Sequence, residues 1–233
     1  DLLKRAKEVP KKLEDLEIKC SQLEKEIKEM MLQIPNIIHS SVPIGKNDEE
    51  NVEIKKIGKP KKFNYEIRHH AQLSENLNGA DFDTAREIAG NGFYFLRGEL
   101  AILSAAMISF ARNNMIKQKF EYIEPPLMIR KKVVDGVMSF KEIEAMIYKI
   151  ENEDLYLIGT SEHSLIGMFM NKILNKEEIP FSITGFSPCF RKEVGAHGIE
   201  EKGFYRVHQF YKQEMVVVCE PEDSYKWYDK MLK

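Results

Sequence analysis

The residues best suited to chemistry lie in one stretch, FRKEVGAHGIEEKGFYRVHQFYKQE, which begins at Phe190 and ends at Glu214. Two segments with strand-like alternation, 183–193 and 204–219, flank a loop of Gly, Glu and Lys, which predicts a β-hairpin. Residues two apart in a strand share a face. One face of this hairpin is therefore expected to carry Arg191, Glu193, Arg206, His208, Phe210, Lys212 and Glu214.

This predicted face has the donors and acceptors for a zwitterionic or nucleotide ligand. Arg191 could bind an anion, Phe210 could stack on a planar base, and Glu214 could hold an ammonium group. The same pattern also fits a solvated sheet face that is stabilised by cross-strand ion pairs. An aromatic ring between the charges favours a ligand only weakly, so the residues leave both interpretations open.

The elements around the hairpin have a mixed order. Residues 98–117 form a long segment that is apolar on more than one face, so it is expected to be a helix buried on several sides and a candidate subunit interface. Asp83 is a candidate cap for a helix over 81–89. Further helices are expected over 140–149, 162–174 and 222–233, and further strands over 93–95, 120–123 and 154–158. This order predicts an α+β domain on an antiparallel sheet, over residues 76–233.

Residues 1–35 carry a heptad seam that predicts one strand of a coiled coil. Pro10 is expected to kink this helix or to mark its true start. The seam consists of Leu2, Ala6, Val9, Leu13, Leu16, Cys20, Leu23, Ile27, Met30 and Ile34. It needs a partner helix, either from another chain or, as we favour, from the other half of a helical hairpin. Residues 36–75 are expected to be a connector with one short strand over 52–57.

Composition excludes several classes of function. The 233 residues include 43% hydrophobic residues and have a formal net charge of -2, so any contact with RNA must use local basic patches. The three cysteines are far apart, which argues against a disulfide framework or a cysteine zinc site. No signal peptide, long apolar run or Gly-rich phosphate loop is present, which predicts a cytoplasmic protein with no membrane contact.

The hairpin motif resembles a known family. FRKE, a loop flanked by Gly195 and Gly203, and then GFYRVHQFYKQE resemble the second signature of class II aminoacyl-tRNA synthetases, and RVHQFYKQE is particularly similar to seryl-tRNA synthetases. The segment 98–126, which ends in Glu-Pro-Pro, resembles the first signature, and Thr160-Ser161-Glu162 resembles the TxE serine-binding loop. The segment DLYLIGTSEHSL resembles the corresponding segment of archaeal members of the family.

The resemblance implies a fold, an activity and a set of partners. The fold would be the class II antiparallel sheet flanked by helices, preceded by the end of a coiled-coil tRNA-binding arm. The enzyme would join L-serine to ATP as seryl-adenylate, with Mg2+, and transfer the seryl group to the 3′ end of tRNA(Ser). A homodimer through 98–126 is implied, and a selenocysteine tRNA is a further candidate partner.

The resemblance also implies roles for individual residues. Arg191 would be catalytic and would bridge the serine carboxylate and the α-phosphate. ATP would be bound by Arg191, Glu193 at the adenine amino group, Arg206 at the far phosphates, the Val207 backbone and the Phe210 ring. Serine would be bound by Thr160 and Glu214 at its ammonium group, Glu162 at its hydroxyl, and Arg191. His197 and Lys202 would contact tRNA, whereas His208 is expected to be structural.

One departure concerns the family's third signature, a Gly-rich strand and helix with an ATP-binding arginine, which is not found before Lys233. The metal-binding carboxylate is likewise expected beyond this residue, so the sequence is expected to be incomplete at both ends. A polypeptide that truly ended at Lys233 would then lack useful aminoacylation activity.

Two alternatives remain. One is a catalytically inactive, synthetase-like dimer that binds tRNA or a partner, against which the presence of Arg191 and Glu214 argues. The other is a paralogue that loads an amino acid onto a carrier protein, against which the heptad helix argues.

Overall fold

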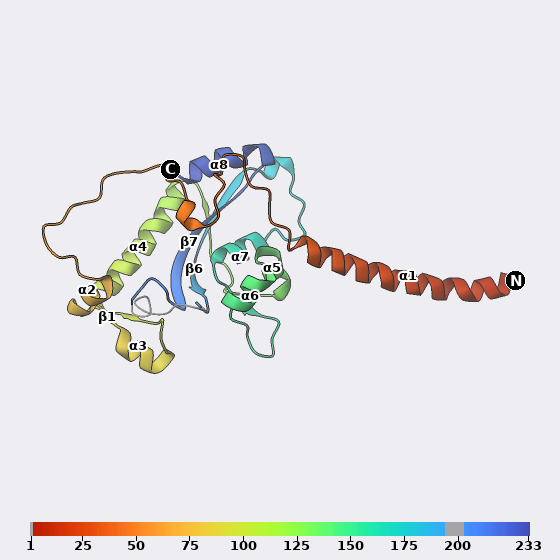
Figure 1. Cartoon of the computed structure of the whole chain (residues 1–233), viewed down its shortest axis with the longest axis horizontal. Coiled ribbons are helices and arrows are strands. Elements are labelled where there is room, and N and C mark those ends of the chain that lie inside the picture. Colours follow the sequence, from red (N-terminus) through yellow and green to blue (C-terminus); the bar gives the residue numbers. More distant parts are fainter. Residues whose placement is uncertain (1, 194–202) are drawn as a thin grey trace. The chain divides into compact units, whose positions relative to one another are not determined.

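The computed structural model describes residues 2–193 and 203–233 (Figure 1). Contacts divide the chain into two compact units, Asp1–Asn64 and Tyr65–Lys233. The second unit therefore includes residues that the sequence assigns to the connector. The helix α2 (His70–Asn76) lies there, and its Ala71 is part of a buried cluster.

The first unit consists of α1 (Leu2–Met31), the one-turn helix η1 (Asp48–Glu50) and extended chain. The helix α1 continues through Pro10, so the alternative that Pro10 marks its start is wrong. The seam residues Leu13, Leu16, Leu23 and Ile27 are exposed, as expected for an apolar stripe that needs another helix to cover it. The strand predicted over 52–57 is wrong, because these residues join no ladder and their backbone stays open to water.

The second unit is built on a three-stranded sheet with the order β3-β6-β7. The long strands β6 (Phe181–Phe190) and β7 (Gln209–Val218) pair antiparallel, whereas β3 (Glu121–Ile123) pairs parallel with β6. The predicted α+β class is confirmed. Both hairpin strands are shorter than predicted, because β6 ends at Phe190 and β7 begins at Gln209.

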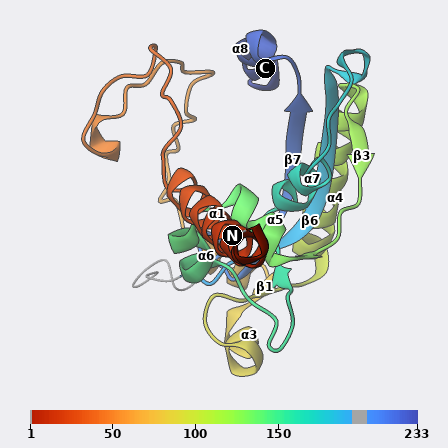
Figure 2. The same cartoon turned by 90° about the vertical axis from the view of Figure 1, so that its right-hand side faces the viewer.

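Two helices cover opposite faces of this sheet (Figure 2). The helix α7 (Ser161–Gly167) packs Leu165 over Gly185, so close that an added Cβ would lie 3.0 Å from Leu165 Cδ1. The helix α4 (Gly98–Lys117) lies on the other face, where Ala101 and Ile108 share a pocket with Tyr211. The expected burial of α4 on several sides is wrong for this single chain, since its apolar side chains Ile102, Leu103, Met107 and Phe110 are exposed.

Short elements complete the unit. They are β1 (Ala80–Asp81), α3 (Phe82–Ala89), β2 (Phe95–Leu96), β4 (Met128–Ile129), α5 (Lys131–Val137), α6 (Phe140–Met146), β5 (Tyr156–Leu157), η2 (Lys176–Glu178), η4 (Pro221–Asp223) and α8 (Ser224–Met231). The sequence did not predict α5, and α6 and α7 end earlier than predicted. Asp81 caps α3 in place of Asp83, because its Oδ1 accepts a hydrogen bond from the Thr84 N–H at 3.0 Å.

A core cluster forms beside the sheet where β4, α5, the end of α6 and β5 meet. Its buried members are Ile129, Val134, Ile147, Tyr156 and Ile158. Ile158 directly precedes the turn that leads into α7, so this core holds the start of α7 against the sheet.

Replacing Ile158 with alanine is expected to lower the free energy of unfolding by about 2–5 kcal/mol, because a fully buried side chain leaves a cavity. Urea denaturation measures the change. Ile173→Ala is the matched control, since Ile173 is 99% exposed and its truncation should change stability by less than about 0.5 kcal/mol. Equal losses in the two variants would contradict this assignment of the core.

Candidate functional site

The site forms where the start of α7 meets one face of the β6–β7 ladder. Phe210, Lys212 and Glu214 of β7 share this face and pair with Cys189, Ser187 and Gly185 of β6. The Ser161 hydroxyl donates a hydrogen bond to the Gly185 carbonyl at 3.0 Å, which ties the first residue of α7 to the ladder. Thr160, just before α7, is thereby brought to Glu214.

Thr160 and Glu214 form the centre of the site. The buried Thr160 caps α7, and its Oγ1 accepts a hydrogen bond from the Glu162 N–H at 3.3 Å. The same hydroxyl donates to Glu214 Oε1, and Lys212 Nζ forms an ion pair with the same oxygen. Both contacts use Oε1 of the Glu214 carboxylate.

Arg191 lies on the same face as this pair. Its Nε donates a hydrogen bond to the Gly159 carbonyl at 3.1 Å, and its guanidinium carbon lies 5.2 Å from the centre of the Phe210 ring. A cation over an aromatic face is attracted by the ring's quadrupole. The structure thus brings together Thr160, Arg191, Phe210 and Glu214.

Glu193, Arg206 and Val207 are placed differently from the prediction. They lie beyond the ends of β6 and β7, so strand alternation does not set their directions. Glu193 has a φ of 44°, in the left-handed region that costs a non-glycine residue roughly 1–2 kcal/mol. Its carboxylate pairs with Arg206 at 3.6 Å, with side-chain exposures of 18% and 54% respectively, and Val207 is buried.

The side chains of three further predicted residues are not placed in the site by the contacts described above. Glu162 is the second residue of α7, and its side chain is exposed. His197 and Lys202, predicted to contact tRNA, lie outside the described residues.

The sequence prediction missed His163, which is buried on α7 behind the site. The pKa of His163 is lowered from 6.5 to about 4, mainly by burial and further by the positive charges of Arg191 and Lys212, while the negative charge of Glu214 opposes the shift. Its Nδ1 has no hydrogen-bond partner among the described residues. In the sequence, the signal that could have identified His163 is its position three residues after Thr160, the N-cap of the same helix.

The depressed pKa of His163 predicts a pH dependence of stability. A neutral folded histidine contributes fully above the unfolded pKa of 6.5, and this contribution is lost as the pH falls towards 4. The loss should reach roughly 3 kcal/mol, given about 1.4 kcal/mol per pKa unit. Urea denaturation at pH 7.5 and 4.5 should therefore show a smaller pH effect in His163→Gln than in the wild type. The same pH effect in both proteins would refute the depressed pKa.

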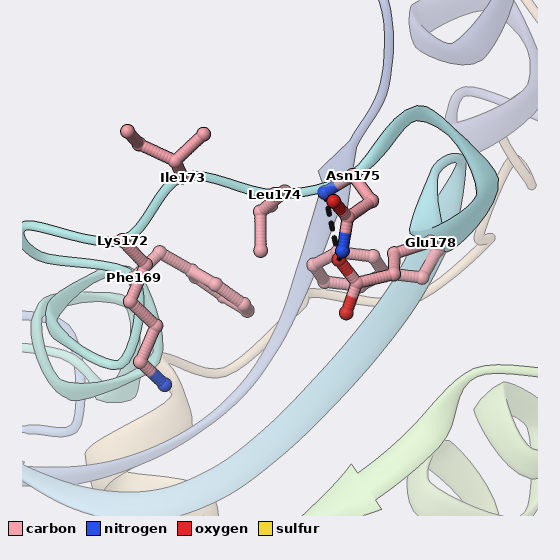
Figure 3. A pocket seen from close by; sticks show the side chains of 7 residues that line it. Phe169, Lys172, Ile173, Leu174, Asn175 and Glu178 are labelled. Carbon is pink, nitrogen blue, oxygen red and sulfur yellow. Dashed lines mark hydrogen bonds between the residues drawn. The ribbon is translucent and has the colours of Figure 1, made fainter.

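Among the described residues, another pocket, the acidic and histidine side chains and the helices do not favour a different functional site. A pocket lined by Phe169, Leu174, Asn175 and Glu178 contains none of the predicted residues, and its Glu178 is engaged by the Asn175 side chain at 2.8 Å (Figure 3). Within residues 2–193 and 203–233, no group of three or more His, Cys, Asp or Glu side chains could hold a metal ion. No helix in the same ranges is long and apolar enough to cross a membrane.

Comparisons with known proteins cover the whole chain. A family model described as the tRNA synthetase class II core domain (G, H, P, S and T) matches residues 144–233. The Serine--tRNA ligase of Methanocella arvoryzae is 40% identical over 231 residues, which is 99% of this chain and 54% of that protein.

Two solved structures are also similar. The seryl-tRNA synthetase of Pyrococcus horikoshii complexed with ATP has a TM-score of 0.93 and 39% identity, covering 100% of this chain and 56% of that one. The cytoplasmic serine-tRNA ligase of Naegleria fowleri in complex with AMP has a TM-score of 0.86 and 31% identity, covering 94% and 53%. The chain spans about half the length of the relatives that it matches.

Proposed function

The chain belongs to the seryl-tRNA synthetase family of class II aminoacyl-tRNA synthetases, and from this premise we propose that it carries out ATP-dependent activation of L-serine and transfer of the seryl group to tRNA(Ser). One observation carries the proposal. The Arg191 guanidinium, the Phe210 ring and the Thr160–Glu214 pair share one face of the β6–β7 ladder. These are a cation, a stacking surface and an anion, which together match serine and an adenine nucleotide.

Serine would bind between Glu214 and Arg191. Its ammonium group would bind Glu214 Oε2, and its carboxylate would bind the Arg191 guanidinium. Thr160 supports this arrangement because its hydroxyl holds the other oxygen of Glu214. Glu162 would accept a hydrogen bond from the serine hydroxyl, and a site built for that bond would penalise alanine. Because Glu162 is exposed here, this contact is a prediction for the serine-bound state.

ATP would bind at the loop end of the hairpin, where β6 ends and β7 begins, with Mg2+ accompanying its phosphates. The adenine would stack on Phe210, with Glu193 at its amino group and the Val207 backbone beside it. Arg206 would hold the far phosphates. Glu193 and Arg206 pair at 3.6 Å in this structure, so ATP binding would have to part them.

In the first reaction, a serine carboxylate oxygen would attack the α-phosphorus. The bond to the bridging oxygen of pyrophosphate breaks, and pyrophosphate leaves with that electron pair. Arg191 would neutralise the charge that builds between the carboxylate and the phosphate.

In the second reaction, a hydroxyl of the terminal tRNA ribose would attack the seryl carbonyl carbon, and AMP would leave. The coiled-coil arm, His197 and Lys202 are the proposed tRNA contacts, with a selenocysteine tRNA as a further candidate, and the setting would be the cytoplasm.

Serine-dependent exchange of pyrophosphate into ATP by the full-length protein tests the function. Exchange with serine, but not with threonine, alanine or glycine, would support it. No exchange with any amino acid, from a protein shown to be folded, would overturn it in favour of a non-catalytic binder. Activation of serine followed by loading of a carrier protein in place of tRNA would identify the paralogue.

A homodimer through α4 is part of the proposal. The exposed stripe of Ile102, Leu103, Met107 and Phe110 lies on the face of α4 away from the pocket that it forms with Tyr211. Phe110→Asp is expected to convert the dimer to a monomer in sedimentation velocity. Ile88→Asp is the control, because Ile88 is similarly exposed but lies on α3. A wild-type monomer, or an equal effect of both substitutions, would exclude this interface.

A further inference from the structure

The residue His208 contacts both polar groups of the Arg191 main chain. Arg191 is the first residue after β6, so the ladder proper has ended there. Its N–H donates a hydrogen bond to the His208 carbonyl at 3.0 Å. Its own carbonyl oxygen lies 2.9 Å from His208 Nδ1. The backbone of His208 therefore contacts the Arg191 N–H, and the ring of His208 contacts the Arg191 carbonyl.

The His208 ring is itself fixed from three sides. Phe93 stacks on it, with ring centres 5.2 Å apart and an angle of 23° between the planes. Gly92 leaves the space for it, because an added Cβ would lie 2.7 Å from His208 Cδ2. The Gly92 carbonyl also accepts the His208 backbone N–H at 2.9 Å. The third contact is the Tyr148 hydroxyl, 2.8 Å from Nδ1.

These contacts select one tautomer of His208. A carbonyl oxygen only accepts hydrogen bonds, so Nδ1 must carry the hydrogen that it donates to the Arg191 carbonyl. Tyr148 Oη is then a second acceptor for the same hydrogen. Burial raises the pKa of Tyr148, and the nearby negative charge of Glu193 raises it further. The Tyr148 hydroxyl thus stays protonated at neutral pH.

We propose that His208 and Tyr148 are positioning residues for Arg191, and that the Nδ1–H tautomer of His208 fixes the main chain from which the catalytic guanidinium extends. This inference rests on the proposed function for its catalytic consequence, but the contact between His208 and Arg191 does not. A long arginine side chain reaches its ligand accurately only if its backbone is fixed, and a displacement of about 1 Å can cost about a hundredfold in rate.

Two amide substitutions separate the two ring nitrogens. In His208→Asn the side-chain NH2 lies near the position of Nδ1 and can still donate to the Arg191 carbonyl. In His208→Gln it lies near the position of Nε2 and cannot. In the full-length protein, His208→Gln is expected to lower kcat for serine-dependent exchange by about 10- to 100-fold with little change in KM for serine, whereas His208→Asn should keep most of the wild-type kcat. Tyr148→Phe should lower kcat less than His208→Gln does.

A second measurement is independent of catalysis. Amide hydrogen exchange at Arg191 is expected to be at least about tenfold faster in His208→Gln than in the wild type, and close to wild type in His208→Asn. Exchange at Thr184, in the middle of β6, should be unchanged in all three proteins. Equal values for His208→Asn and His208→Gln, both in kcat and in the Arg191 amide exchange rate, would overturn the proposal and leave a purely structural histidine. If the wild type activates no amino acid, the proposed function fails, and the Arg191 exchange rates alone decide the positioning role.

Discussion

Arg191→Ala is expected to lower kcat/KM for serine-dependent exchange by about a thousandfold or more, which corresponds to about 4 kcal/mol of transition-state stabilisation. The reason is that one guanidinium would neutralise two anions, the serine carboxylate and the α-phosphate, which must approach each other. Its alignment is already present, because Nε donates to the Gly159 carbonyl and the group lies over Phe210. The Arg191 side chain then needs no reorganisation during the reaction.

Two further variants sharpen the Arg191 experiment. Arg191→Lys keeps the charge but loses the planar fork of donors, so it should recover only a small part of the activity. Arg68→Ala is the charge-matched control, because Arg68 is exposed and lies outside the site. The assay is pyrophosphate exchange in the full-length protein, with urea denaturation as a check of folding. Activity in a folded Arg191→Ala protein within tenfold of the wild type would remove Arg191 from the catalytic role.

Glu214→Gln is expected to raise KM for serine by about a hundredfold, because a hydrogen bond to a charged group is worth about 1.5–3 kcal/mol. Glutamine keeps the shape and can still accept the hydrogen bond from the Thr160 hydroxyl. It loses the negative charge that would hold the serine ammonium group. The charge of Lys212, which pairs with Glu214 in the wild type, would then be unbalanced and would repel that ammonium group.

The effect of Glu214→Gln should be specific for serine. KM for ATP should change by less than about threefold, since ATP would bind nearer the hairpin loop, at Phe210 and beyond, and not at the Glu214 carboxylate. Glu87→Gln, at an exposed position of α3, controls for the loss of one negative charge. A normal KM for serine in Glu214→Gln, or an equal rise for both substrates, would contradict the role of Glu214 in binding the ammonium group.

Local patterns predicted the regular elements that carry the site. The bounds of α4 agree with the structure because residues 98–117 contain a long apolar segment whose only Gly is at the start. Alternation along 210–214 correctly predicted that Phe210, Lys212 and Glu214 share a face, because the pleat of β7 continues without a bulge. The signature motifs identified the family, since they place particular side chains in a particular order along the chain.

Tertiary contacts decided the rest. Arg191, Glu193 and Arg206 lie where the ladder has ended, and periodicity has no meaning there. Arg191 takes its position from Gly159 and His208, which are distant in sequence. His163 is buried only because α7 packs on the sheet beside Arg191 and Lys212. A sequence pattern reports the face of a residue within its own helix or strand, whereas these positions depend on hydrogen bonds and packing between segments that meet only in the folded chain.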